Sequence, residues 1–235
     1  MKLAFNILIL MLTGTYCFSQ ETYKVTLFRA APGHMLELLE DLKTRAQSVE
    51  SSPLIIRHSQ GDHWDYLILE PVGSFSEYFI SNNEVFTPVY GDEFYDLVSF
   101  HEQVFMTGPE RDEFIKMAET YSFFHVEMFV ALAGKQNELL KERKMENVYL
   151  NEIGRNQNLI FTSIIGSSLD SFTLGGYRDI KHFAESADIS IELEESAALK
   201  AGFKGVTDIS PYLRSLISKH NDTLGNKVSY LQVSE

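Results

Sequence analysis

The segment FFHVEMFVALAGKQNELLKERK (123–144) decides the fold, because the chain has used the same pattern once before. Residues 22–43 read TYKVTLFRAAPGHMLELLEDLK, and the two segments, aligned from Tyr23 and Phe124 at an offset of 101, are identical at eight of twenty-one positions. The identical pairs are Val25/Val126, Phe28/Phe129, Ala30/Ala131, Gly33/Gly134, Glu37/Glu138, Leu38/Leu139, Leu39/Leu140 and Lys43/Lys144. Each segment reads as a strand, a glycine turn and a helix, so we interpret the two as copies of one unit.

A hairpin follows the helix in each copy, and Gly61 and Gly166 occupy matching positions in its turn. Hairpin strands and a last strand complete each unit: 54–59, 64–70 and 97–106 in the first copy, and 159–174 and 227–233 in the second. A second, broken helix is predicted over about 74–90, and three helical pieces over 179–222. The order in each unit is therefore βαββαβ.

The first nineteen residues have the composition of a secretory signal peptide. Lys2 precedes an apolar run, and the small residues Cys17 and Ser19 suit cleavage before Gln20. The apolar run is too short for a permanent membrane helix. We therefore expect a secreted or periplasmic protein that has no membrane association once residues 1–19 are removed.

The mature chain is strongly acidic. Removal of residues 1–19 leaves 19 Lys and Arg (20 minus Lys2) against 33 Asp and Glu, a formal charge of −14. Such a charge disfavours nucleic acid as a partner. The single cysteine of the chain lies in the predicted signal peptide, so the mature chain has no disulfide, no Cys-bound metal and no thiol nucleophile.

A βαββαβ unit packs both helices on one face of its sheet and leaves the other face to be covered. Two units solve this by packing sheet against sheet. The chain then supplies its own partner, which is compatible with a monomer, although the sequence does not fix the oligomeric state. This organisation resembles the dimeric α/β-barrel superfamily, the ferredoxin-like group that includes antibiotic-biosynthesis-monooxygenase-type, EthD-like and NIPSNAP-like proteins. The resemblance implies an α+β fold of two tandem ferredoxin-like βαββαβ repeats packed sheet to sheet as a pseudo-dimeric α/β barrel.

The predicted signal peptide and the repeated pattern together divide the chain. Its parts are a signal peptide (1–19), a first repeat (20–108), a connecting helix (109–120) and a second repeat (121–235) with a helical insertion (179–222). The segments FFHVEMFVALAG (123–134) and GGYRDIKHFAE (175–185) are also similar to uncharacterised exported proteins, which brings no function with it.

Alternation along the strands separates two faces of each sheet. In the second copy Val126 and Met128 share one face, whereas His125, Glu127 and Phe129 share the other. We predict that the apolar set meets the helices and that the mixed set lines a pocket between the two sheets. The same polar groups could instead satisfy one another in a sealed core or reach solvent at strand edges.

A pocket of this kind would hold a small, partly aromatic ligand. The candidate catalytic residues, as proton-transfer groups, are His125, Glu127 and Tyr66, and the candidate ligand-binding residues are Arg57, His101, Phe129 and Thr173. His125 and Glu127 stand where the first copy has Lys24 and Thr26, and this difference between copies points to them most directly.

Two cofactor classes remain open. His125, Glu127 and His101 would offer ligands to a divalent metal, although no compact ligand motif is present. Haem ligation by His125 or His101 is suggested only by analogy with the resembled superfamily. The sequence has no phosphate loop, dinucleotide fingerprint or GxSxG elbow, so we expect no nucleotide and no triad hydrolase.

Three functions fit these observations. The first is an exported protein of unassigned activity that binds a small, partly aromatic ligand between the sheets. The second is a nucleotide-independent oxygenase or isomerase of the dimeric α/β-barrel type. The third is an interaction module whose acidic insertion, residues 186–205, docks a protein partner.

Overall fold

The structure is a computed structural model that describes residues 21–49, 51, 53–81 and 90–230. The predicted signal peptide therefore lies outside the described residues. None of the helices within the described part of the chain is long and apolar enough to cross a membrane.

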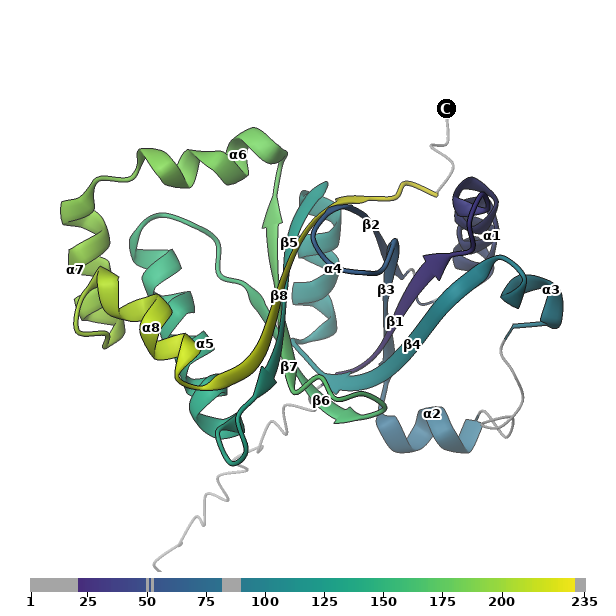
Figure 1. The fold of residues 1–235 in the computed structure, drawn as a ribbon, viewed down its shortest axis with the longest axis horizontal. Helices are drawn as coiled ribbons and strands as arrows, with labels where there is room; N and C mark the ends of the chain where they lie inside the picture. Colours follow the sequence, from purple (N-terminus) through teal and green to yellow (C-terminus); the bar gives the residue numbers. More distant parts are fainter. Residues whose placement is uncertain (1–20, 50, 52, 82–89, 231–235) are drawn as a thin grey trace, which may run out of the picture.

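The described chain contains two halves joined by a helix (Figure 1). The first half comprises β1 (Thr22–Ala30), α1 (Met35–Ser48), β2 (Leu54–Gln60), β3 (Tyr66–Gly73), α2 (Phe75–Ser81), α3 (Asp92–Tyr95) and β4 (Val98–Thr107), and the joining helix is α4 (Arg111–Thr120). The second half comprises β5 (Phe123–Ala131), α5 (Gln136–Glu152), β6 (Leu159–Ile165), β7 (Ser171–Tyr177), α6 (Ile180–Ala184), α7 (Ile191–Ala201), α8 (Ile209–Arg214) and β8 (Ile217–Lys227).

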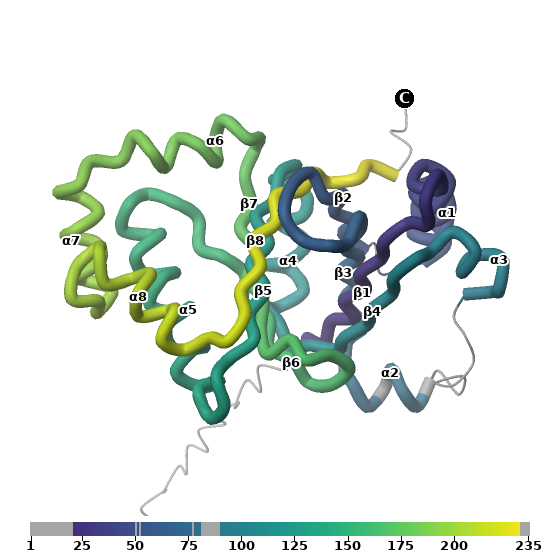
Figure 2. The backbone as a smooth tube through the Cα atoms, in the orientation of Figure 1, coloured from purple at the N-terminus to yellow at the C-terminus, as the bar shows by residue number. Residues whose placement is uncertain are grey.

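The eight strands close into one antiparallel barrel in the order β1-β3-β2-β8-β5-β7-β6-β4. Each half contributes four neighbouring strands in the same order, β4-β1-β3-β2 and β8-β5-β7-β6. The halves meet edge to edge, because β2 pairs with β8 and β4 pairs with β6. Figure 2 shows β8 running past β2 before the C-terminal segment continues toward α1. Closure leaves no unpaired edge in either sheet.

Equivalent contacts recur in the two halves. The amide of Ala30 donates to Asp65 Oδ2 at 2.8 Å, and the amide of Ala131 donates to Asp170 Oδ2 at the same distance. The hairpin glycines also correspond. Gly61 (φ +136°) packs against the backbone of β8, and Gly166 (φ +116°) packs against the backbone of β4. A Cβ atom on Gly61 would lie 2.3 Å from a backbone oxygen of β8, so glycine allows each hairpin to lie against the other half.

Apolar side chains fill the barrel, which shows that the predicted assignment of faces is wrong. Val126 and Met128 point inward with Val25 and Leu27, in a buried cluster that includes residues of β1 to β7. An eight-stranded barrel has an interior just wide enough for side chains, so its lining must be apolar. Between the sheets, a cavity of about 60 Å³ beside Leu27 and Met128 is too small for an aromatic ligand.

The mixed faces of the strands lie outside the barrel, beneath the helices. Phe28 packs against Leu38 and Leu42 of α1, and Phe129 packs against Leu139 of α5. Helix α4 closes the end of the barrel, since Phe114 lies in the interior cluster and its ring is 5.2 Å from that of Tyr23. Any site built from the mixed faces therefore lies between a sheet and its helices.

The last strand begins earlier than predicted. β8 spans Ile217–Lys227, so the end assigned to the helical insertion, residue 222, falls within the strand, as does the start of the predicted strand at 227. Its sequence, ISKHNDTLGNK, does not read as a strand because small or polar residues, Thr223 and Gly225, occupy its inward face. Val228 continues the sheet with one hydrogen bond to Ile55 and packs on the first half.

Candidate functional site

A buried group of charged residues lies between the second-half sheet and α5. Four positions, related by the repeat alignment and by strand pairing, differ between the halves: Lys24/His125, Thr26/Glu127, Leu42/Arg143 and Gln103/Asp222. The strands and the helix that carry these positions correspond in the two halves. The four differences therefore place charged side chains together between the second-half sheet and α5. We call His125, Glu127, Glu142, Arg143, Glu146, His220 and Asp222 the polar cluster.

Histidines and carboxylates alternate along the strand side of the polar cluster. His125 Nε2 lies 3.2 Å from Asp222 Oδ1, and His220 Nε2 lies 3.3 Å from the same oxygen. His220 Nε2 is also 3.5 Å from Glu127 Oε1, while Glu127 Oε2 accepts a 2.9 Å hydrogen bond from Thr173. The pairing of β5 with β7 and β8 sets this arrangement, because Glu127 faces both Thr173 and Asp222.

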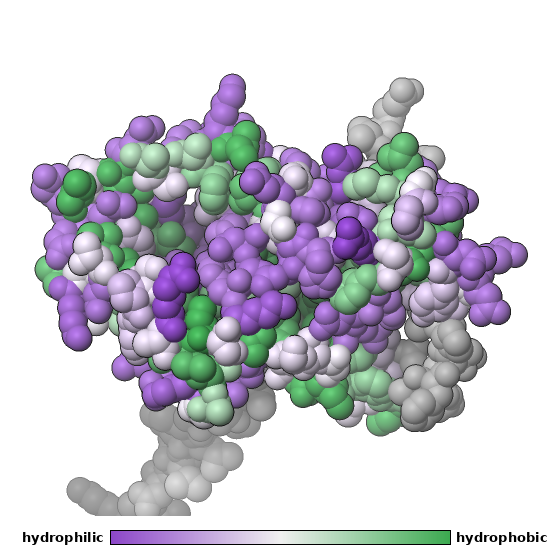
Figure 3. All heavy atoms as spheres, viewed as in Figure 1, coloured by the Kyte–Doolittle hydropathy of each residue, from purple (hydrophilic) through white to green (hydrophobic). Residues whose placement is uncertain are grey.

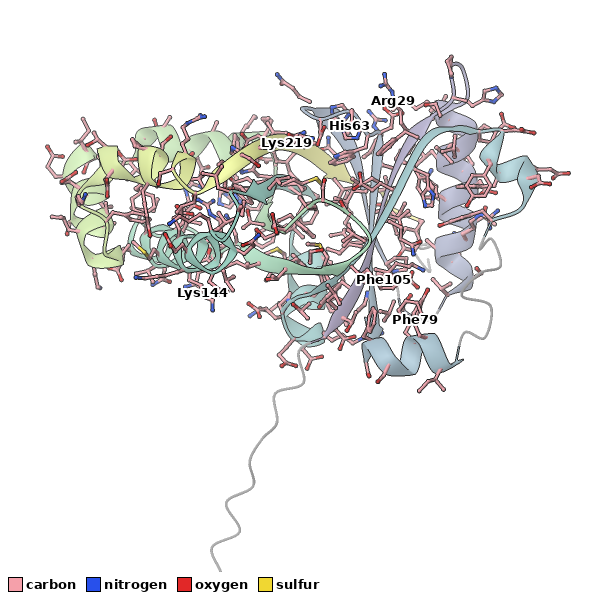
Figure 4. All side chains as sticks on the ribbon, turned by 60° about the horizontal axis from the view of Figure 1, so that its bottom comes forward. Arg29, His63, Phe79, Phe105, Lys144 and Lys219 are labelled. Atoms are coloured by element: carbon pink, nitrogen blue, oxygen red, sulfur yellow. The ribbon has the colours of Figure 1, made fainter. Side chains whose placement is uncertain are left out.

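Arg143 forms the helix side of the polar cluster. Its guanidinium makes two hydrogen bonds to Glu142, at 2.6 and 2.8 Å, and pairs with Glu146 one turn later. It also lies 3.6 Å from Glu127 and 4.8 Å from the ring centroid of Phe129. Arg143 is 1% exposed and Glu142 is fully buried. Lys144, the next residue, points away from the sheet (Figure 4).

The charges of the polar cluster shift the pKa values of its members. The hydrogen bond between His125 and Asp222, together with the nearby His220 imidazole, holds the pKa of Asp222 well below its usual range. Asp222 and Glu127 together raise the pKa of His220 to about 9. Burial opposes protonation of His125, but the same carboxylates outweigh it and raise the pKa of His125. Both histidines therefore hold a proton more readily beside these carboxylates than a free imidazole does.

Burial also acts on the pKa values of Glu127 and Glu146. Burial acts to raise the pKa of Glu127, yet His220, Arg143 and His125 outweigh it and lower that pKa. For Glu146, burial raises the pKa to about 7, opposed by Arg143 and assisted by Glu127 and Glu142. Glu127 is therefore ionised, whereas Glu146 titrates near neutrality.

The polar cluster reaches the surface at His125 and Asp222, whose side chains are 21% and 55% exposed. The ring of Phe183 on α6 lies 5.5 Å from that of His125 and 5.1 Å from that of Tyr177. The Arg155 side chain, which donates to the carbonyl of His182 at 2.7 Å, holds α6 in this position. Figure 3 shows the surface hollowed beneath α6. A small molecule entering there would meet an aromatic wall and then the histidine.

The structure brings together four of the predicted site residues, His125, Glu127, Phe129 and Thr173, on the outer face of the second half. It places the other three on the first half. Arg57 is exposed on β2, and the Tyr66 hydroxyl donates to the carbonyl of Met35 beneath α1. His101 stacks on Phe28, with 4.9 Å between ring centroids.

First-half aromatic residues gather around α2 rather than in a shared pocket. Phe105 lies beside Phe79, with ring centroids 5.1 Å apart (Figure 4). Nearby, Lys24 Nζ pairs with Glu70 at 2.5 Å, in the position that corresponds to His125. The two halves thus keep separate environments outside the barrel.

Sequence reasoning missed His220, Asp222, Arg143 and Glu146. His220 and Asp222 lay in a stretch predicted to be helical, so they were not considered as strand residues. The sequence does contain a signal for this strand. His101 and Gln103 on β4 occupy the positions that His220 and Asp222 occupy on β8, each pair facing the first strand of its half. Arg143 was hidden because it replaces Leu42, a core residue of the first-half helix.

The donor set suits a small cation better than haem. Nε2 of His125 faces a carboxylate at 3.2 Å, and two carboxylates surround the space where an iron would lie. A porphyrin needs a broad apolar slot instead. His101 does not supply one either, since its ring is stacked on Phe28 and edged by Tyr90 and Tyr95. We therefore derive no chemistry through haem.

No known family model matches this chain, and no relative is found among curated proteins. Solved structures are similar over almost the whole chain. An anthrone oxidase-like protein superposes with a TM-score of 0.63 at 10% identity, over 92% of this chain and 97% of that chain. This chain has the dimeric α/β-barrel fold.

Two further structures share the dimeric α/β-barrel fold. A candidate monooxygenase from Fusobacterium nucleatum subsp. nucleatum has a TM-score of 0.54 at 12% identity, over 90% of this chain and 94% of that chain. A candidate chlorite dismutase has a TM-score of 0.51 at 12% identity, over 90% and 96%. At these identities the likeness is one of fold, and no residue role is carried across.

Proposed function

We propose that the second half of the barrel binds a small, partly aromatic molecule beneath α6 and transforms it without a nucleotide, as an oxygenase- or isomerase-type enzyme. The observation that carries this proposal is the asymmetry of the two halves. Where the first half has Thr26 and Leu42, the second buries Glu127 and Arg143. Buried charges add little to stability over an apolar contact, so a role in binding or catalysis explains them better.

His125 is the residue placed to act on the ligand. It stands at the exposed margin of the polar cluster, and Asp222 orients its ring from 3.2 Å. An imidazole held by a carboxylate can donate or accept a proton at a bound hydroxyl or carbonyl group. Phe183 and Tyr177 would hold the aromatic part of the ligand beside it.

The comparisons support only the reaction class of this proposal. Three of the similar structures, with TM-scores of 0.63, 0.54 and 0.51, are described as anthrone oxidase-like, as a candidate monooxygenase and as a candidate chlorite dismutase. Oxidation chemistry is therefore the first class to test, and isomerisation by proton transfer is the second. The duplication of the unit explains how one half can keep the fold while the other carries the site.

Two bicyclic probes test the location of the site: 1-naphthol, which is neutral, and 1-naphthoate, which is anionic. We expect crystals soaked with these probes to show density against Phe183 and His125. In fluorescence titrations, Phe183→Ala should weaken binding at least tenfold. The matched control is Phe105→Ala in the first half, which should leave binding unchanged.

Two results would contradict the proposed site. One is that both probes bind Phe183→Ala as tightly as the wild-type protein. The other is that bound probe appears only between the first-half sheet and its helices, near Lys24 and Tyr90, where a cavity of about 240 Å³ is present.

Export is part of the proposal, because Lys2, the apolar run and the small residues before Gln20 are typical of a signal peptide. Intact-mass measurement of protein recovered from the medium or periplasm should show a chain that begins at Gln20. Recovery of the full-length chain from the cytoplasm alone would refute it. The interaction-module alternative is less favoured, since Ala198 and Ala201 of α7 pack within the chain near Met145 of α5.

A further inference from the structure

We propose that His125, Glu127 and Asp222 form a binding site for a divalent transition-metal ion. The role of such an ion depends on the proposed function, because the ion would lie where the small molecule is expected to bind. The evidence for the ion site is independent of that function, since it is the geometry of the three side chains.

One ligand atom from each of the three residues lies within 4.8 Å of the other two. The contact between His125 Nε2 and Asp222 Oδ1 is 3.2 Å. Around an ion with bonds of about 2.0 to 2.2 Å, neighbouring ligand atoms are about 3 to 3.6 Å apart. Small rotations of Glu127 and Asp222 would therefore bring all three atoms to one ion.

The local charges favour a cation despite the nearby arginine. Arg143 is matched by Glu142, with two hydrogen bonds, and by Glu146. Its contact with Glu127 is longer, at 3.6 Å. A dication would displace the proton that His125 holds beside Asp222, and Glu127 and Asp222 would then share their charges between the ion and His220.

His220 contacts both carboxylates and helps to position them. Its Nε2 atom lies 3.3 Å from Asp222 and 3.5 Å from Glu127, yet this buried atom makes no hydrogen bond of good geometry to either. An imidazole that contacts two ligating carboxylates is a common support for a metal site. We therefore assign His220 as a positioning residue and not as a ligand.

The site would keep open coordination positions. Three protein ligands converge among the residues that the structure describes, and Asp222 is 55% exposed, so water or a substrate could complete the sphere from the hollow beneath α6. One imidazole and two carboxylates suit Mn²⁺, Fe²⁺, Co²⁺ or Zn²⁺. The equivalent positions of the first half hold Lys24, Thr26 and Gln103, which do not offer this set of ligands.

The test uses untagged, EDTA-treated protein and Co²⁺ as the probe. We expect saturable binding of one Co²⁺ per chain by calorimetry, with visible absorption from a histidine- and carboxylate-bound ion. Asp222→Asn and Glu127→Gln should each weaken binding at least tenfold. Asp222 is largely exposed, so its variant should fold normally, as circular dichroism would show. His101→Ala is the matched control, because His101 stacks on Phe28 as His220 does on Phe129.

The proposal is overturned if the wild-type protein shows no saturable Co²⁺ binding, or if Asp222→Asn binds Co²⁺ as the wild-type protein does. Failure of the metal site is distinguishable from failure of the proposed function. Binding of 1-naphthol or 1-naphthoate by the metal-free protein, with loss in Phe183→Ala, would retain the small-molecule site and reject the ion alone.

Discussion

His220 lies flat against Phe129, with 4.7 Å between ring centroids and 8° between ring planes. In the first half His101 stacks on Phe28 in the same way, at 4.9 Å and 13°. Each pair joins the last strand of its half to the first strand. The surroundings differ, because Nε2 of His220 faces carboxylates such as Asp222. One scaffold thus carries an aromatic environment in one half and a charged one in the other.

The Glu142–Arg143 pair should matter far more for stability than its first-half counterpart. Glu142→Gln leaves a guanidinium that is 1% exposed without its bidentate partner. Glu146 still pairs with the guanidinium, so the loss is that of charge-assisted hydrogen bonds and should be about 1.5 to 3 kcal/mol. Urea unfolding, followed by circular dichroism, measures the difference in the free energy of unfolding.

The matched control for that measurement is Asp41→Asn. Asp41 occupies the corresponding position on α1 and pairs with Arg45, but both side chains are at least 33% exposed. An exposed pair contributes about 0 to 1 kcal/mol. Equal losses from Glu142→Gln and Asp41→Asn would show that burial of the second-half pair has no energetic consequence.

Glu146 should make stability depend on pH near neutrality. Its pKa in the folded protein, about 7, exceeds the ordinary value of 4.5 because desolvation of the half-buried side chain opposes ionisation. A carboxyl group whose pKa is raised by folding stabilises the fold below pH 4.5, and that contribution is lost as the pH rises through 7. The loss is up to about 3 kcal/mol.

Substitution by glutamine isolates the effect of Glu146, since the amide stays neutral. With EDTA present, Glu146→Gln should match the wild-type stability at pH 5 and exceed it at pH 8. Arg143, Glu142, Glu127 and His125 surround the carboxyl group and are unchanged in the variant. Glu138→Gln, at an exposed position of the same helix, is the control. If the free energies of unfolding of the wild-type protein and Glu146→Gln differ by the same amount at pH 5 and pH 8, the pKa of Glu146 is not raised.

The fold could be predicted from the sequence because its signals are local. Strand alternation, the turns at Gly33 and Gly134, and helical spacing repeat in order, and only a few arrangements cover the sheets of two βαββαβ units. The assignment of faces failed for a physical reason. Alternation separates two faces, but it does not say which one meets the helices and which one lines the barrel.

The site was predicted only in part because it depends on packing across distant segments. His125 and Glu127 were visible as differences from Lys24 and Thr26. Their partner Asp222 lies on a strand whose inward residues are small or polar, which removed the usual strand pattern. A buried ion pair under a sheet likewise has no local sequence signature.

Gly61 should be more sensitive to substitution than a turn glycine that lies in open space, such as Gly33. Gly61→Ala would place a methyl group 2.3 Å from the carbonyl oxygen of Asp222, at a φ of +136°. Clash and backbone strain together should cost about 2 kcal/mol or more, because β8 cannot move without losing its pairing with β2. Thermal unfolding measures this loss. Gly33→Ala is the control, since its φ is also positive but nothing lies within 4 Å, and a loss as large there would reject the crowding argument.

The first half should not persist as a soluble monomer when it is expressed alone. In residues 20–108, β2 loses its partner β8 and β4 loses its partner β6. Apolar residues that face the barrel interior, such as Val25, Leu67 and Val104, would also be exposed to water. Unpaired strand edges and an uncovered apolar face drive association, so the fragment should form dimers or aggregates. Size-exclusion chromatography with light scattering checks this against residues 20–235, which we expect to be monomeric. A stable monomeric fragment would contradict the mutual dependence of the halves that the closed barrel requires.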